Sequence, residues 1–196
     1  MRPLAITLLL AAVACGGEAT IAPPAPNSVT GKVRGQPLAK VTSVAVLHTA
    51  DPMTPGDYPQ LVVLVTTDLA AGCGQLAGNP KSARSFLLAL ASLSGKTWSA
   101  PGAVGSFAIT EHSGPGAGLT DGRYATAVYL ESDASCGTVK ANAATGTTGS
   151  VVLTKAGTTA GDELVGTFDV IIEGGDRLLG TFDTTLCGAA TAGTCQ

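Results

Sequence analysis

The chain has 196 residues, of which 45% are hydrophobic but only 13% are charged, and its net charge at pH 7 is −3. Typical soluble domains contain about 25% charged residues; here Thr, Ser, Gly and Ala take their place. Because the chain has no basic stretch to follow a phosphate backbone, its composition argues against nucleic acid as a partner. The low aromatic content of 4% argues against a surface of stacked rings for sugars or bases.

The N-terminal segment has the layout of a bacterial export signal. Arg2 is followed by an apolar run over residues 4–13 and then by small residues. As a helix, this run would reach about 15 Å, half the thickness of a bilayer core, so it is too short to span a membrane. We therefore predict that residues 1–14 are a signal peptide that is removed on export.

The last residues of this segment, Ala-Val-Ala-Cys at 12–15, resemble the lipobox of bacterial lipoproteins. The resemblance implies cleavage before Cys15, a diacylglyceryl group on its thiol and an acyl chain on its amine. Ala12 stands where the family usually has Leu. Each buried methylene contributes about 0.8 kcal/mol, so two or three acyl chains hold a protein stably on a bilayer. The alternative is ordinary signal-peptidase cleavage, which would leave Cys15 as a free thiol.

Residues 16–28, GGEATIAPPAPNS, are rich in Gly, Pro and small polar residues and predict a flexible tether. Gly16 is not the Asp that often retains lipoproteins at an inner membrane, which favours the outer membrane in a cell that has two. We expect a signal peptide over 1–14, a lipidated Cys15 with its linker over 15–28, and one domain over 29–196. That domain is long enough to bury a core of its own.

Four cysteines remain in the domain: Cys73, Cys136, Cys187 and Cys195. An even number in an exported chain predicts two disulfides. Of the three possible pairings, the short loop between Cys187 and Cys195 favours joining these two, which leaves Cys73 for Cys136. The chain-entropy model gives about 2.5 kcal/mol for the short loop and about 4 for the long one. A zinc site is the rival interpretation, but no C-x-x-C spacing occurs, and we expect no metal.

The domain reads as short strands separated by turns rich in Gly and Pro. Strands are predicted at residues 29–33, 41–48, 60–68, 104–110, 123–132 and 148–156. Residues 82–93 are ambiguous, because Ala and Leu favour a helix, but Phe86, Leu88 and Leu90 alternate as in a strand, and we predict a strand. Short strands at even spacing without a long helical period predict an all-β fold, an antiparallel β-sandwich or a barrel.

The tetrapeptide Gly-Thr-Phe-Asp occurs twice, at residues 166–169 and 180–183. A hairpin with a three-residue loop at 174–176 would pair Phe168 with Phe182 and gather the large apolar residues on one face. A slip by one residue would scatter these side chains over both faces. We therefore interpret the repeat as architecture rather than as a catalytic motif.

In this register Asp169 and Asp183 lie on the outer face as polar strand positions, not as an acid/base pair. The chain has no G-x-S-x-G sequence, so a nucleophile elbow is absent. A triad assembled from distant residues could use His48 or His112, but no motif supports it. We therefore predict that the protein is not an enzyme.

Two further patterns fall short of a binding motif. Residues 95–97, Gly-Lys-Thr, end like a phosphate-binding loop, but the glycine required five residues earlier is Leu90. Asp51, Asp57 and Asp68 could bind Ca²⁺ if their loops converge, but the D-x-D-x-D-G run is missing. We expect no cofactor.

Three longer stretches, residues 61–73, 97–109 and 148–187, resemble a group of uncharacterised bacterial lipoproteins. The shared pattern is one of glycines and apolar residues and covers most of the predicted domain. The resemblance implies an exported β-rich domain of unknown role, and it supplies no catalytic residue.

Three functions stay open for this chain. The first, which we expect, is an envelope lipoprotein held on the lipid bilayer through acylated Cys15, with a non-catalytic structural or binding domain. The second is a carrier that holds a small apolar ligand in a barrel, which requires a closed sheet with an empty apolar interior. The third is an envelope hydrolase, which requires His48 or His112 to meet a carboxylate and a hydroxyl.

Overall fold

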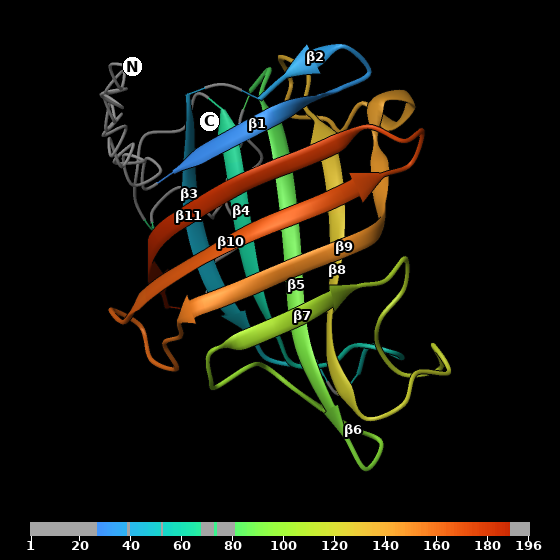
Figure 1. Ribbon diagram of the computed structural model, residues 1–196, viewed down its shortest axis with the longest axis vertical. Coiled ribbons are helices and arrows are strands. Elements are labelled where there is room, and N and C mark those ends of the chain that lie inside the picture. The colour runs from blue at the N-terminus through green and yellow to red at the C-terminus, as the bar shows by residue number, and fades with distance from the viewer. Residues whose placement is uncertain (1–26, 39, 52, 68–72, 74–80, 189–196) are drawn as a thin grey trace, which may run out of the picture.

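The structure is a computed structural model that describes residues 27–38, 40–51, 53–67, 73 and 81–188 (Figure 1). The predicted signal peptide and most of the linker, including Cys15, lie outside these residues. So do Asp68 and Cys195.

Strands make up most of the described chain. They are β1 (Ser28–Val33), β2 (Gln36–Pro37), β3 (Val41–His48), β4 (Gln60–Thr67), β5 (Arg84–Ser94), β6 (Thr97–Ser99), β7 (Gly105–Ile109), β8 (Gly122–Glu131), β9 (Ala144–Lys155), β10 (Glu163–Ile172) and β11 (Arg177–Cys187). A short 3-10 helix, η2 (Lys140–Asn142), precedes β9. The all-β prediction is confirmed, and the ambiguous segment 82–93 forms strand β5, with Phe86, Leu88 and Leu90 fully buried.

Eight of the strands close into a barrel in the order β3-β4-β5-β8-β7-β9-β10-β11, and β11 pairs with β3 to complete the ring. In Figure 1, β7, β9, β10 and β11 cross in front of β3, β4, β5 and β8, so the barrel is flattened into two layers. Strands β1, β2 and β6 are additions outside the ring. The pairings β3–β11 and β7–β8 are parallel, so the sheet is mixed and not purely antiparallel.

Aromatic and aliphatic side chains from both layers fill the interior of the barrel. The rings of Phe86 on β5 and Phe168 on β10 lie 5.2 Å apart between centroids, so opposite walls touch in the middle. Phe107, Tyr129 and Phe182 are likewise at most 1% exposed. An eight-stranded barrel has an interior just wide enough for side chains to fill, which agrees with this packing.

The β10–β11 hairpin has the predicted loop length but not the predicted register. Its three-residue loop is 173–175 rather than 174–176: the amide of Ile172 donates to the carbonyl of Asp176 at 2.9 Å. The predicted pairing of Phe168 with Phe182 is therefore wrong. The shift along the partner strand is two residues, so every side chain keeps the face that the sequence predicted.

The repeated tetrapeptide explains this register. Phe168 pairs with Gly180, and Phe182 pairs with Gly166. A Cβ atom on Gly180 would lie 2.4 Å from Cζ of Phe168, and one on Gly166 would lie 2.4 Å from Cζ of Phe182. Each ring thus occupies the space that the glycine of the other copy leaves empty, an arrangement that two directly opposed rings would not permit.

The two ends of the barrel are closed by different devices. At one end the β1–β2 hairpin buries Val33 and Leu38 in the core, and the Arg34 guanidinium donates to the carbonyls of Ala141 and Ala143. At the other, Trp98 of β6 packs between two tyrosines in a separate small cluster. No helix in the described part of the chain is long and apolar enough to cross a membrane.

Candidate functional site at the seam between β3 and β11

The pairing that closes the barrel is short. Strand β11 meets β3 only at Leu186–Ala45 and Cys187–Val46, whereas β3 is paired with β4 along its whole length. Beside this seam lies a groove of about 280 Å³. We call it the seam groove. The described residues that line it are Asn27, Thr42, Ser43, Val44, Cys73, Asp183, Thr184, Thr185 and Cys187.

Asn27 holds the two strands together where their backbones are no longer paired. Its Nδ2 donates to the carbonyl of Asp183 at 3.2 Å, and its Oδ1 accepts from the amide of Asp183 at 3.2 Å. A carboxamide offers the same donor and acceptor as a peptide group, so Asn27 takes the place of a strand neighbour. On the other side, the hydroxyl of Ser43 on β3 donates to the same Oδ1.

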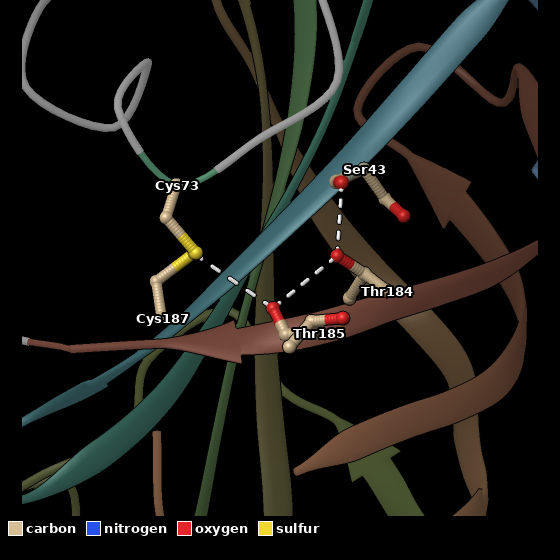
Figure 2. The surroundings of a disulfide bond; sticks show 5 residues. All are labelled: Ser43, Cys73, Thr184, Thr185 and Cys187. Atoms are coloured by element: carbon tan, nitrogen blue, oxygen red, sulfur yellow. Dashed lines mark hydrogen bonds between the residues drawn. A yellow bond between two sulfur atoms is a disulfide. The ribbon is translucent and has the colours of Figure 1, made fainter. Parts of the chain in front are cut away.

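A second side chain crosses the seam directly. The hydroxyl of Thr184 on β11 donates to the carbonyl of Ser43 on β3 at 2.9 Å (Figure 2). With Asn27, this bond satisfies backbone groups that the short parallel ladder leaves unpaired. Hydroxyl and amide groups therefore line part of the groove, beside Val44 and the two cysteines. Among the described residues of the lining, the half-exposed Asp183 is the only charged one.

A disulfide joins Cys73 to Cys187 at one end of the groove (Figure 2). The predicted pairing of Cys187 with Cys195, and of Cys73 with Cys136, is therefore wrong. Nearness in sequence favoured that choice, but barrel closure brings the end of β11 to the connection between β4 and β5, with the two Cα atoms 5.3 Å apart. Cys136 is also disulfide-bonded.

His48 has a carboxylate partner. Its Nε2 lies 2.8 and 2.9 Å from the two oxygens of Asp57, which also accepts from the amides of Asp51 and Tyr58. The Asp51 amide, followed by His48, lowers the pKa of the Asp57 carboxyl. Within the part of the chain that the structure describes, no hydrogen bond joins a hydroxyl to His48.

His112 lies elsewhere, in a shallow hollow of about 270 Å³ that it shares with Glu111, Glu173 and two threonines. Among the described residues, no three His, Cys, Asp or Glu side chains lie close enough together to hold a metal ion. Gly95 and Lys96 form the two-residue turn between β5 and β6, and Thr97 begins β6; both turn residues have positive φ, as a tight hairpin turn requires.

The two Asp residues of the repeated tetrapeptide have different surroundings. Asp169 forms a two-bond ion pair with Arg177 across the hairpin, and this guanidinium lowers the pKa of the Asp169 carboxyl. Asp183 lies in the seam groove and is bonded through its backbone to Asn27. They do not face each other, since Asp169 pairs with Leu179 and Asp183 with Val165.

The residues of the seam groove carry little signal in the sequence. Asn27 fell within the expected linker, and Ser43 and Thr184 read as ordinary polar strand positions. A single Asn at the end of a proline-rich stretch carries no local signal for a bond to a residue 156 positions away. The sequence predicted that the cysteines form disulfides, but it did not predict which cysteines pair.

No family model matches this chain, and neither the curated proteins nor the solved structures contain a match.

Proposed function

We propose that the protein is an exported lipoprotein of the bacterial cell envelope, in which acylated Cys15 holds a non-catalytic barrel on the bilayer. The barrel serves a structural or binding role. The observation that carries the proposal is the order of the N-terminal segments: a charged start, an apolar run too short to span a membrane, and a lipobox that ends at Cys15.

The disulfide supports export. Cys73 and Cys187 are bonded, and Cys136 is disulfide-bonded as well. Structural disulfides form and persist in oxidising compartments such as the periplasm and the cell surface, and they are rare in the cytosol. The disulfides of the domain and the predicted export signal at the N-terminus therefore both indicate export from the cytosol.

The barrel interior favours this proposal over a carrier. The sheet is closed, as a carrier needs, but Phe86 and Phe168 meet across the interior and Phe107 and Phe182 fill the space around them. A ligand would have to displace these rings. The surroundings of His48, with a carboxylate and no bonded hydroxyl among the described residues, likewise give no support to the hydrolase alternative.

The proposal places the seam groove near the membrane. Asn27 is bonded to the barrel, and only eleven residues of chain lie between it and Cys15. An extended chain spans at most about 3.5 Å per residue, so the groove would stay within about 40 Å of the bilayer. The partner of a binding role is therefore to be sought at or near the membrane surface.

The test uses fatty-acid labelling of the full-length chain in a bacterial host. We expect the wild type to incorporate an alkyne-tagged fatty acid and to stay with membranes after an alkaline wash, and Cys15→Ser to lose the label and leave the membrane fraction. Gly17→Ser, which keeps the lipobox, is the matched control. A wild-type chain that carries no label, or a Cys15→Ser chain that remains on washed membranes after signal cleavage, would contradict the proposal.

A further inference from the structure

The disulfide sits at the weakest point of the barrel. The ladder between β3 and β11 contains two residue pairs, whereas β10–β11 contains nine and β3–β4 contains eight. Beyond those two pairs, side chains bridge the strands: Asn27 and Thr184 do so, and the Ser43 hydroxyl donates to the carbonyl of Asp183 at 3.5 Å. Cys187 is one of the two residues of β11 that pair with β3, so its bond to Cys73 fixes the end of this short ladder.

The two cysteine residues differ in exposure. Cys73 is an exposed residue, whereas Cys187 is only 5% exposed, and both line the seam groove, which opens to solvent. A reagent that approaches along the groove therefore meets the more exposed residue, Cys73, first. Thiol–disulfide exchange depends on such access, and the sulfur that is attacked decides which cysteine leaves.

A backbone carbonyl lies where the leaving thiol of Cys187 can donate a hydrogen bond. The carbonyl oxygen of Thr185 lies 3.8 Å from Sγ of Cys187 (Figure 2). Once reduced and protonated, Cys187 can donate its S–H to this oxygen without moving into the core. Cys73 would meanwhile lose its only covalent tie to β11.

We propose that the Cys73–Cys187 disulfide is an exchange site for a dithiol reductant and that its reduction opens the barrel between β3 and β11. A thiolate of the reductant attacks Sγ of Cys73, the S–S bond breaks, and its electron pair passes to Cys187, which takes up a proton. The second thiol of the reductant then attacks the mixed disulfide and releases Cys73. Two electrons are transferred, and the reductant becomes a disulfide.

The consequence of reduction is local. Ala45 and Leu186, which pair across the seam, are at most 1% exposed and belong to the core. Without the disulfide, their pairing depends on one further residue pair and on the side-chain hydrogen bonds of Asn27, Ser43 and Thr184. The β3–β4 and β10–β11 ladders remain, so the seam opens and the rest of the barrel stays folded.

The direction of attack is tested by trapping. The probe is a thioredoxin-type C-x-x-C protein whose second Cys is replaced by Ser, incubated with the oxidised full-length chain, so that the mixed disulfide accumulates. We expect mass mapping to find the probe on Cys73. Probe attached to Cys187 or to Cys136, or no adduct at all, would overturn the proposal.

The opening of the seam is tested by hydrogen exchange. After reduction of the wild type, confirmed by alkylation of Cys73 and Cys187, we expect the amides of residues 45–46 and 186–187 to exchange at least tenfold faster, with β9 and β10 unchanged. The double variant Cys73→Ser, Cys187→Ser should match the reduced wild type, and Cys136→Ser should match the oxidised one. An unchanged exchange rate at the seam of the reduced wild type would overturn the opening, whatever the variants do.

Discussion

Tyr129 is the largest polar side chain within the core of the barrel. It is 1% exposed, and its hydroxyl donates to Glu131 Oε1 at 2.6 Å. The other oxygen of Glu131 accepts from the side-chain Nδ2 of Asn142 in η2. Burial, followed by the neighbouring Glu131 carboxylate, raises the pKa of the Tyr129 hydroxyl far above its ordinary value of 10.0. The folded barrel therefore keeps this tyrosine protonated in alkaline solution.

This raised pKa predicts a loss of stability at high pH. Above pH 10 the unfolded chain releases the Tyr129 proton and the folded chain retains it, so the free energy of unfolding falls as the pH rises. One proton corresponds to a slope of at most about 1.4 kcal/mol per pH unit. Urea unfolding between pH 8 and pH 11 should show a steeper fall for the wild type than for Tyr129→Phe.

The control for this prediction is Tyr124→Phe. Tyr124 lies on the same strand but bonds to the carbonyl of Thr120, outside the main core. Because Tyr129 is intact in this variant, its pH slope should equal that of the wild type. Equal slopes for the wild type and Tyr129→Phe would contradict the assignment.

Within a single element, the β10–β11 hairpin shows how shape selects among registers that hydrophobicity leaves equivalent. Moving the loop by one residue changes the register by two, and both registers place Phe168, Phe182 and Leu178 inside. Burial of apolar area therefore does not distinguish them. The close approach of each ring to a glycine does, because any larger residue at Gly166 or Gly180 would collide with it.

Gly180→Ala is accordingly expected to destabilise the barrel. Its new Cβ would lie 2.3 Å from the carbonyl oxygen of Ser28 and 2.4 Å from Cζ of Phe168, so β1 and the ring must both shift. Overpacking of this kind costs about 1–3 kcal/mol. Urea unfolding at pH 7 measures the loss.

Gly102→Ala is the matched control. Its added Cβ would have an ordinary contact, 3.6 Å from Cγ2 of Thr158, and its backbone is not in the left-handed region. Its free energy of unfolding should stay within about 0.5 kcal/mol of the wild type. If Gly180→Ala proved as stable as Gly102→Ala, the Gly–Phe packing would not determine the register.

At the scale of the whole molecule, closure and filling of the barrel distinguish a tethered domain from a carrier. The eight-stranded ring has two parallel pairings, β3–β11 and β7–β8, each of two residue pairs. At the first of these, strands from opposite ends of the described domain meet, whereas β7 and β8 follow each other in sequence. Inside, the contact between Phe86 and Phe168 joins the two layers directly.

A filled interior predicts that the wild type takes up no apolar probe. We expect 1-N-phenylnaphthylamine to show no fluorescence increase with the oxidised wild type. Phe168→Ala, which removes a ring at the centre of the barrel, should leave a cavity and bind the probe, at a cost of about 3–5 kcal/mol in stability.

Leu153→Ala, a smaller truncation of another core residue on β9, serves as a second variant if Phe168→Ala is too unstable to purify. Saturable binding of the probe by the wild type would favour the carrier over the tethered domain.

Properties that depend on neighbouring residues could be predicted from the sequence. The alternation of Phe86, Leu88 and Leu90 predicted β5 against the helix propensity of its Ala and Leu residues, because a two-residue period places these side chains on one buried face. The same period fixed which face of the β10–β11 hairpin is buried. The order of the N-terminal segments likewise predicts export and lipidation of Cys15.

Which distant segments meet follows from the folded barrel and not from local sequence. The disulfide partner of Cys187, the groove beside Asn27 and the parallel closure of the barrel depend on backbones brought together across more than a hundred residues. Local pattern carries no information about such contacts, since burial constrains the face of a strand and not its neighbour. Closure of the barrel determines these contacts, and the fit of phenylalanine against glycine determines the register of the β10–β11 hairpin.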